Sequence, residues 1–218
     1  AIVLGTEMSP EEVSRFGSVK MPLVVLDTFY DSLPFDFVDM NNIGAAFAVI
    51  EHFVEHGHRE IGFVKGNVEV ENFRLRGRGY RRAMEQFGLP VGRQSVVPVD
   101  ATYQGAYRDM LAYLKSGGKL PPALFISNDI IAYGCIKAMR EHGLAVPHDI
   151  SVIGFDDLPM SAVMYIPLTT FAVSKQSMGR RAFELCASKL IEGREHMPEK
   201  ILIDGRLIER NSVTRRAV

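Results

Sequence analysis

The sequence predicts an α/β protein built on a doubly wound, mostly parallel sheet. Apolar segments of strand length alternate with helical segments along the 218 residues. The strand segments are continuously apolar, which is typical of parallel strands that are buried on both faces. Most of the helical segments end at a glycine or a proline. These three observations favour repeated strand-helix-strand units around a buried sheet.

The predicted elements follow this alternation in chain order. The apolar runs expected to form strands are Ala1–Leu4, Leu23–Leu26, Phe35–Val38, Glu60–Val64, Ser95–Val99, Ala123–Ile126, Ser151–Phe155, Leu168–Phe171 and Lys200–Ile203. The expected helices are Asn41–His56, Glu71–Phe87, Tyr103–Leu114, Asp129–His142 and Ser174–Ile191. The last of these helices is expected to end at Gly193.

Composition narrows the class of protein. No apolar run approaches the roughly 18 residues of a membrane helix, so we expect no membrane partner. With 47% hydrophobic residues and a net charge of -1, the chain is expected to be soluble and globular, without general attraction to phosphate. Cys135 and Cys186 lack metal-ligand spacing, so we expect core thiols of a cytoplasmic protein and no cofactor. The chain opens on a strand without an initiator Met, as if cut from something longer.

Polar residues follow most of the predicted strands. Ligands of open parallel sheets bind at the carboxyl ends of the strands. The residues at these ends are Asp27, Asp39, the loop Asn67–Asn72 with Arg74 and Arg76, Asp100, Ser127–Asp129 and Asp156–Asp157. Glycine-rich phosphate loops are missing, since G-x-x-x-x-G-K-[ST] is absent and RGRGY lies within a helical segment. The sequence therefore predicts a polar ligand site but disfavours a nucleotide fold.

His52, Glu55 and His56 match the spacing H-x-x-E-H, which could hold zinc with Glu55 as a base. The alternative is a polar stripe on a surface helix. We favour the stripe, because His56 directly precedes Gly57 and no third ligand is nearby.

Arginines 74, 76, 78, 81 and 82 could contact nucleic-acid phosphates. Only Tyr80 supplies an interleaved aromatic ring, and the arginines point in different directions around the helix. We therefore favour a solvated helix face. Arg76 is the expected exception, since it lies nearest the strand ends.

Asp156 and Asp157 are adjacent acids at the end of a buried strand. Paired acids could perform general acid-base work, but neighbouring residues at a strand end point to opposite sides. The simpler hypothesis is that one accepts hydrogen bonds from a hydroxyl-rich ligand and the other caps the next turn, although both could be caps. No G-x-S-x-G and no serine with a credible base is present, so we do not expect an enzyme.

Several stretches form a combined signature in the order VVLD (Val24–Asp27), AVIEHFVEHGHREIGFVKG (Ala48–Gly66), FRLRGRGYRRAM (Phe73–Met84), PPALFISNDIIAYGCIKAMREHGLAVPHDISVIGFDDLP (Pro121–Pro159), IPLTT (Ile166–Thr170) and MGRRAFELCASKLIEG (Met178–Gly193). Together they cover almost the whole chain and resemble the effector-binding core of the LacI/GalR family of bacterial transcriptional regulators. The resemblance implies a periplasmic-binding-protein-like fold of type I, with two Rossmann-like lobes and the effector in the cleft between them. The first lobe, 1–39 and 173–195, is expected to be incomplete, and the second to comprise 40–172 and 196–218.

The resemblance also implies the ligand-binding residues. The family's polar contacts carry over to Asp27, Arg76, Asn128 and Asp156, and further cleft-facing positions fall on Asp39, Asn72 and Asp100. Asp156 is then the ligand acceptor and Asp157 the turn-former. Many family members carry an aromatic residue at the positions of Asp39 and Asp100, and a glutamine at that of Val173. These departures make a purine effector unexpected, and an amine-bearing or strongly hydroxylated ligand suits the extra negative charge.

The implied function is the effector-binding and dimerisation core of a transcriptional repressor that responds to a sugar or another small polar metabolite. Operator DNA is expected only through the amino-terminal helix-turn-helix, which this sequence does not include. A homodimer is expected, through the helix Ile130–Arg140 with Ile131, Cys135 and Met139 or through the Tyr165 region, although these residues could all pack inward. The alternative function is a solute-binding protein of a sugar transporter, which shares the fold.

Overall fold

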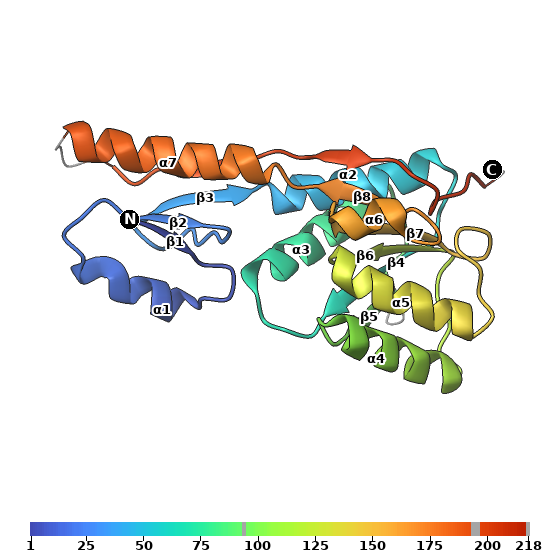
Figure 1. Ribbon diagram of the computed structural model, residues 1–218. Coiled ribbons are helices and arrows are strands. Elements are labelled where there is room, and N and C mark those ends of the chain that lie inside the picture. Colours follow the sequence, from blue (N-terminus) through green and yellow to red (C-terminus); the bar gives the residue numbers. More distant parts are fainter. Residues whose placement is uncertain (93–94, 193–196, 217–218) are drawn as a thin grey trace. The chain divides into compact units, whose positions relative to one another are not determined.

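The computed structural model describes residues 1–92, 95–192 and 197–216 (Figure 1). The chain divides into two compact units: unit 1 comprises Ala1–Asn42, Glu69–Leu75 and Ser174–Gly205, and unit 2 comprises Ile43–Val68, Arg76–Val173 and Arg206–Val218. Each unit contains a mainly parallel sheet with helices packed on it, so the predicted α/β fold is confirmed. Among the described residues, no helix has both the length and the apolar character that a bilayer crossing requires.

Unit 1 is built on a four-stranded parallel sheet in the order β1-β2-β3-β9. Its strands are β1 (Ile2–Leu4), β2 (Val24–Leu26), β3 (Asp36–Met40) and β9 (Lys200–Ile203). Helix α7 (Lys175–Glu192) packs on β1, β2 and β3, and Figure 1 shows α1 (Pro10–Ser14) on the other side of the sheet. A 3₁₀ turn, η1 (Arg15–Ser18), follows α1. Val13 of α1 packs in a buried apolar cluster with Leu23, Val25 and Phe37.

Unit 1 differs from the sequence-based expectation at two strands. Strand β3 continues to Met40, so Asp39 lies within the strand rather than after its end. Lys200–Ile203 was expected in the second lobe, but β9 pairs with β3 in the sheet of unit 1. The predicted end of α7 at Gly193 lies outside the described residues.

A buried ion pair joins α7 to β3. The Nζ atom of Lys189 donates to both carboxylate oxygens of Asp36, at 2.5 and 2.6 Å. The backbone N–H of Glu199, just before β9, donates to the same carboxylate at 2.7 Å. Because each charge is buried, loss of either partner would leave the other uncompensated. Asp36 thus ties the helix and the neighbouring strand to β3.

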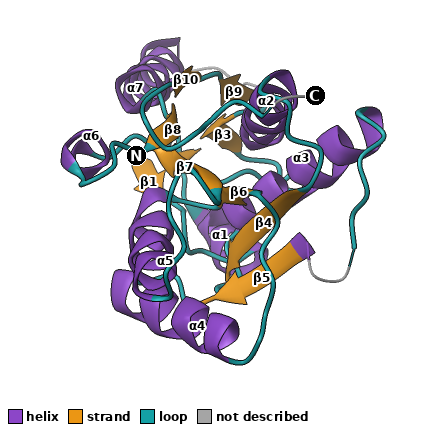
Figure 2. Ribbon diagram, turned by 90° about the vertical axis from the view of Figure 1, so that its right-hand side faces the viewer, coloured by secondary structure: helices purple, strands orange, loops and turns teal. Residues whose placement is uncertain are grey.

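Unit 2 contains a six-stranded sheet in the order β10-β8-β7-β6-β4-β5, in which only β10 runs antiparallel to its neighbour. Its strands are β4 (Ile61–Gly66), β5 (Val96–Val99), β6 (Ala123–Ile126), β7 (Ser151–Asp156), β8 (Thr169–Ala172) and β10 (Arg206–Ile208). Its helices are α4 (Tyr103–Lys115), α5 (Asp129–Glu141), α6 (Pro159–Val163) and most of α2 (Asn42–Glu55) and α3 (Glu71–Gln86). Figure 2 shows α4 and α5 together on one side of the sheet, with α2 and α3 on the other. Neither α6 nor β10 was among the predicted elements.

A row of aromatic rings crosses the sheet of unit 2. Phe63, Phe125, Phe155 and Phe171 lie on the adjacent strands β4, β6, β7 and β8, with successive ring centroids 5.1, 6.3 and 5.6 Å apart. Such cross-strand aromatic pairs stabilise a sheet beyond the area that they bury. Phe63 and Phe125, and Phe155 and Phe171, are direct partners in the register of neighbouring strands.

Candidate functional site

Arg76 lies at the carboxyl ends of β6 and β7. Its Nη1 atom donates to the carbonyl oxygen of Ser127 at 2.6 Å, and its Cζ atom lies 3.6 Å from the centroid of the Phe155 ring. Its Nη2 atom is 3.8 Å from Oδ1 of Asp156. The guanidinium is therefore fixed by a hydrogen bond, a ring face and a carboxylate. The expectation that Arg76 alone among its neighbouring arginines leaves the solvated face is confirmed, because arginines 74, 78, 81 and 82 are exposed.

Asp156 has a backbone conformation that its residue type rarely adopts. Its φ is 109° and that of Asp157 is 49°. Asp27, which follows β2 in unit 1, has φ 64°, and these three aspartates are the non-glycine residues with positive φ in the described part of the chain. Asp tolerates this region better than most residues, but the conformation still costs free energy. Backbone strain of this kind concentrates at functional sites. The ends of β2 and β7 are therefore candidate functional positions.

Asp157 does not cap the next helix, contrary to the hypothesis from sequence. Its carboxylate oxygen Oδ1 accepts a hydrogen bond from Nη2 of Arg210 at 2.7 Å. Helix α6 begins after Leu158, and no side chain caps it there. Arg210 follows β10, an element that sequence reasoning did not predict, so its partnership with Asp157 was missed.

The residue that holds the start of α6 is Asp129, which is fully buried. Its Oδ2 atom accepts hydrogen bonds from the Leu158 N–H at 2.9 Å and the Ser161 hydroxyl at 2.7 Å. Its Oδ1 atom accepts from the Thr170 hydroxyl at 2.7 Å. Burial raises the pKa of the Asp129 carboxyl, and these hydrogen bonds oppose that shift. Sequence reasoning placed Asp129 at a strand end and at the start of the helix Asp129–His142 but gave it no role. The glycine at position 154 is a signal for its place, because a Cβ there would overlap with Oδ1 of Asp129.

Asn128 and Asp100, two of the expected ligand residues, both act as local caps. The Asn128 side chain accepts a hydrogen bond from the N–H of Ile131, and Asn128 is the N-cap of α5. The Oδ1 atom of Asp100 accepts from the backbone N–H of Thr102 at 2.8 Å and from its hydroxyl at 2.6 Å. These hydrogen bonds lower the pKa of the Asp100 carboxyl. Asp100 therefore organises the start of α4.

A second polar cluster lies within unit 1. The Nδ2 atom of Asn72 donates to the carbonyl oxygen and to Oδ1 of Asp27, both at 3.1 Å. The Thr6 hydroxyl donates to Oδ2 of Asp27 at 2.5 Å. The Nδ2 atom of Asn42 in turn donates to Oδ1 of Asn72 at 3.0 Å and to Oδ2 of Asp39 at 3.1 Å. The structure thus brings together the expected residues Asp27, Asn72 and Asp39, with Asp39 fully buried.

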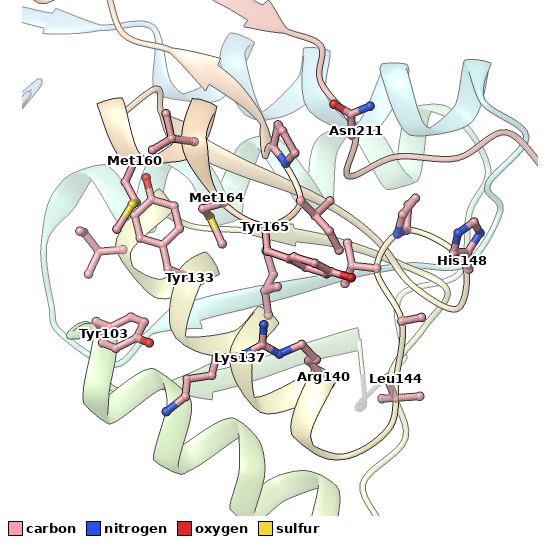
Figure 3. Close-up of a pocket in the computed structure, with 18 of the residues that line it drawn as sticks. Tyr103, Tyr133, Lys137, Arg140, Leu144, His148, Met160, Met164, Tyr165 and Asn211 are labelled. Atoms are coloured by element: carbon pink, nitrogen blue, oxygen red, sulfur yellow. The ribbon is translucent and has the colours of Figure 1, made fainter.

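Unit 2 also has an apolar pocket of about 1740 Å³ against α5 and α6 (Figure 3). The side chains of Val163 and Tyr165 at its rim are 76% and 85% exposed, and Met160 is 57% exposed. By contrast, Ile131, Cys135 and Met139 are fully buried, so for these three residues the alternative left open from sequence, inward packing, is the one observed. The burial of Cys135, and that of Cys186, matches the expected core thiols.

The H-x-x-E-H residues do not form a metal site. Within the described ranges, no group of three or more His, Cys, Asp or Glu side chains could hold a metal ion. The rings of His52 and His56 are 4.1 Å apart, and Nδ1 of His52 is 3.5 Å from Oε1 of Glu209. His52 is buried rather than on a surface stripe, and burial together with His56 lowers its pKa.

Comparisons with known proteins identify the family of the chain. The family described as "Periplasmic binding protein-like domain" matches residues 50–213. The HTH-type transcriptional repressor PurR of Actinobacillus pleuropneumoniae is 30% identical over 213 residues, which cover 97% of this chain and 63% of that repressor. The chain thus spans less than two thirds of the length of this relative.

Solved structures give the same result. A sugar-binding transcriptional regulator of the LacI family from Escherichia coli, complexed with phosphate, superposes with a TM-score of 0.84 at 25% identity, covering 99% of this chain and 77% of that one. A regulatory protein of the LacI family from Chloroflexus aggregans superposes with a TM-score of 0.85 at 27% identity, covering 99% and 76% of the two chains. These relatives are transcriptional regulators and not enzymes, in agreement with the prediction from sequence.

Proposed function

The chain belongs to the periplasmic binding protein-like domain family, in the form found as the effector-binding domain of LacI-family regulators, and from this premise we propose that it senses a small polar metabolite for a transcriptional repressor. The proposed effector is a sugar or a sugar derivative. Units 1 and 2 then correspond to the two lobes of the family, and the proposed location is the cytoplasm. Operator DNA is proposed to contact a separate helix-turn-helix domain of the whole protein.

The observation that supports effector binding is the juxtaposition of Arg76 and Asp156. A guanidinium offers only donors and a carboxylate only acceptors, so the two together match a hydroxyl group, which both donates and accepts. Arg76 is already oriented by Ser127 and Phe155, which reduces the entropy lost when a ligand binds. The positive φ of Asp156 keeps its carboxylate at the strand end despite the strain.

The chemistry of the site favours hydroxylated ligands. Asp156 is the last residue of β7 in unit 2, Asp27 directly follows β2 in unit 1, and both are carboxylates. Carboxylates accept hydrogen bonds from hydroxyl groups and attract amines, whereas an anion would meet only Arg76 as a cationic partner among the expected ligand residues. We therefore propose sugars, sugar alcohols and aminosugars as the class.

We also propose that a second copy of the chain binds the apolar pocket of unit 2. Val163 and Tyr165 are large apolar side chains that stand mostly in solvent, and Met160 and Ile130 extend the same face. Contiguous exposed apolar surface of this kind is typical of protein-protein contacts. The Arg140 guanidinium lies 5.9 Å from the Tyr165 ring, and arginine and tyrosine are both enriched at interfaces.

A ligand screen tests the proposal. Melting temperatures of the wild type and of Asp156→Asn are measured against monosaccharides, sugar alcohols, aminosugars, nucleosides and purine bases. A ligand at 100 times its Kd adds about 2.7 kcal/mol of stability. We expect a shift for one class of hydroxylated compound in the wild type, and a much smaller shift in Asp156→Asn. A ligand that shifts both proteins equally would contradict the assigned site, and a response confined to purine bases would contradict the assigned class.

A further inference from the structure

The buried carboxylate of Asp129 receives hydrogen bonds from three separate parts of unit 2. Thr170 belongs to β8, Leu158 belongs to the turn after β7, and Ser161 belongs to α6. A carboxylate that is shielded from solvent needs such donors, because an unpaired buried charge costs free energy. The same cost opposes the movement of each donor away from the carboxylate. Asp129 therefore fixes these three segments relative to one another.

One side of this network is the turn that carries Asp156. Only Asp157 separates Asp156 from Leu158, whose N–H is held by Asp129. The Asp157 carboxylate is held independently by Arg210. The turn is thus anchored at the two residues that follow Asp156, and this anchoring maintains the strained φ of Asp156.

The other side of the network is the wall of the apolar pocket. The Ser161 hydroxyl that donates to Asp129 also shares a hydrogen bond of 2.7 Å with the Tyr133 hydroxyl. Tyr133 lines the pocket beside Met160 and Met164 of the α6 segment, as Figure 3 shows. The same carboxylate therefore positions both the Asp156 turn and the pocket wall.

We propose that Asp129 is a positioning residue that couples the Asp156 turn to the pocket face through Leu158, Ser161 and Tyr133. The inference rests on the proposed function, in which the turn binds the effector and the pocket face binds a second copy. A change at either end then alters the other end, and thermodynamic linkage requires the two effects to be reciprocal. Coupling of this kind must be shown by measurement at the distant end.

The test perturbs one end of the network and measures the other. Tyr133→Phe removes a hydroxyl from the pocket wall. Thr170→Val removes, without changing side-chain shape, the hydroxyl that donates to Asp129 and accepts from the Asp157 N–H, on the side of the Asp156 turn. Hydrogen exchange of the Leu158 amide, measured by NMR, reports on the turn. Sedimentation equilibrium reports on self-association. The matched control is Tyr107→Phe. This substitution removes the exposed hydrogen bond that the Tyr107 hydroxyl of α4 donates to Glu141 of α5.

We expect Tyr133→Phe to speed exchange of the Leu158 amide by about fivefold, the effect of one lost hydrogen bond of ordinary strength. We expect Thr170→Val to weaken self-association by about the same factor. Tyr107→Phe should change neither quantity. Effects confined to the end that carries the substitution would overturn the coupling.

A further variant separates this inference from the proposed function. Tyr165→Ser removes the most exposed aromatic side chain of the pocket rim. If it leaves self-association unchanged, the proposed interface fails, and exchange of the Leu158 amide in Tyr133→Phe still decides the coupling. If Tyr165→Ser prevents self-association while Thr170→Val does not affect it, the interface stands and the coupling is wrong.

Discussion

The Nη2 atom of Arg76 lies 3.8 Å from Oδ1 of Asp156. This distance allows charge attraction but exceeds that of a hydrogen bond between these two atoms. In the proposed site, a ligand hydroxyl accepts from the guanidinium and donates to the carboxylate. Arg76 is meanwhile held against Phe155 and Ser127, which fixes the orientation of its guanidinium.

Replacement of Arg76 by lysine should weaken effector binding. Lysine keeps the charge but loses the planar fork of donors and the stacking on Phe155. We expect the Kd of a ligand from the screen to rise by about tenfold or more, as measured by isothermal titration calorimetry. Arg78→Lys is the matched control on the same helix, because Arg78 is exposed. Equal losses in the two variants would contradict a specific role for the Arg76 guanidinium.

Gly154→Ala should destabilise the fold. A Cβ at this position would overlap with Oδ1 of Asp129 and crowd Leu168. Overpacking in a buried site costs about 1–3 kcal/mol, so the midpoint of urea unfolding should fall. Gly179→Ala in α7 is the control, since a Cβ there meets nothing within 4 Å. It should stabilise the helix by about 0.5–1 kcal/mol, and a loss in both variants would contradict the explanation.

His58 should make stability depend on pH in the acid range. Burial lowers the pKa of His58 from 6.5, and its Nε2 atom donates to the carbonyl oxygen of Thr214 at 3.0 Å. The unfolded chain therefore takes up the proton at a higher pH than the folded chain does. Stability should fall as the pH drops below 6.5 towards the lowered pKa, since protons then favour the unfolded state.

The measurement is the free energy of unfolding of the wild type and of His58→Gln across this range. The glutamine amide can still donate to Thr214 but does not titrate, so the slope with pH should be smaller in the variant. His148→Gln is the control for the loss of an imidazole as such, because His148 is exposed. An unchanged slope in His58→Gln would assign the pH dependence to other groups.

Tyr165→Ser should reduce self-association. The Tyr165 side chain is 85% exposed at the pocket rim, and large aromatic anchors of this kind dominate protein interfaces. We expect the dissociation constant of the dimer to rise by about tenfold or more, measured by sedimentation equilibrium. Val91→Ser removes an exposed apolar side chain elsewhere in unit 2 and should have no effect.

Much of the fold could be predicted from sequence because its strands are continuously apolar and its helices end at glycine. The position of Asp156 at the carboxyl end of the sheet followed from the same pattern, although β7 includes Asp156 as its last residue. The role of Asp129 could not be predicted in this way. Its partners Ser161 and Thr170 are 32 and 41 residues away, and no local pattern brings them together.

Two other expectations failed for local reasons. Asp39 was placed after its strand because a charged residue normally ends an apolar run, yet β3 continues to Met40 and the Asn42 amide stabilises the buried carboxylate. Asp157 was taken as a helix cap because acids favour that position. Its carboxylate instead binds Arg210. The segment around Arg210 has no apolar periodicity, so the sequence did not predict where this arginine lies.

The most direct test of effector binding is calorimetric titration of the strongest ligand from the screen into Asp156→Asn and Asp157→Asn. Both substitutions remove one negative charge from the same turn, and asparagine tolerates positive φ about as well as aspartate does. The proposed site predicts that Asp156→Asn loses most of the affinity while Asp157→Asn retains it. Equal affinities in the two variants, or a loss confined to Asp157→Asn, would contradict the assignment of Asp156 as the effector acceptor.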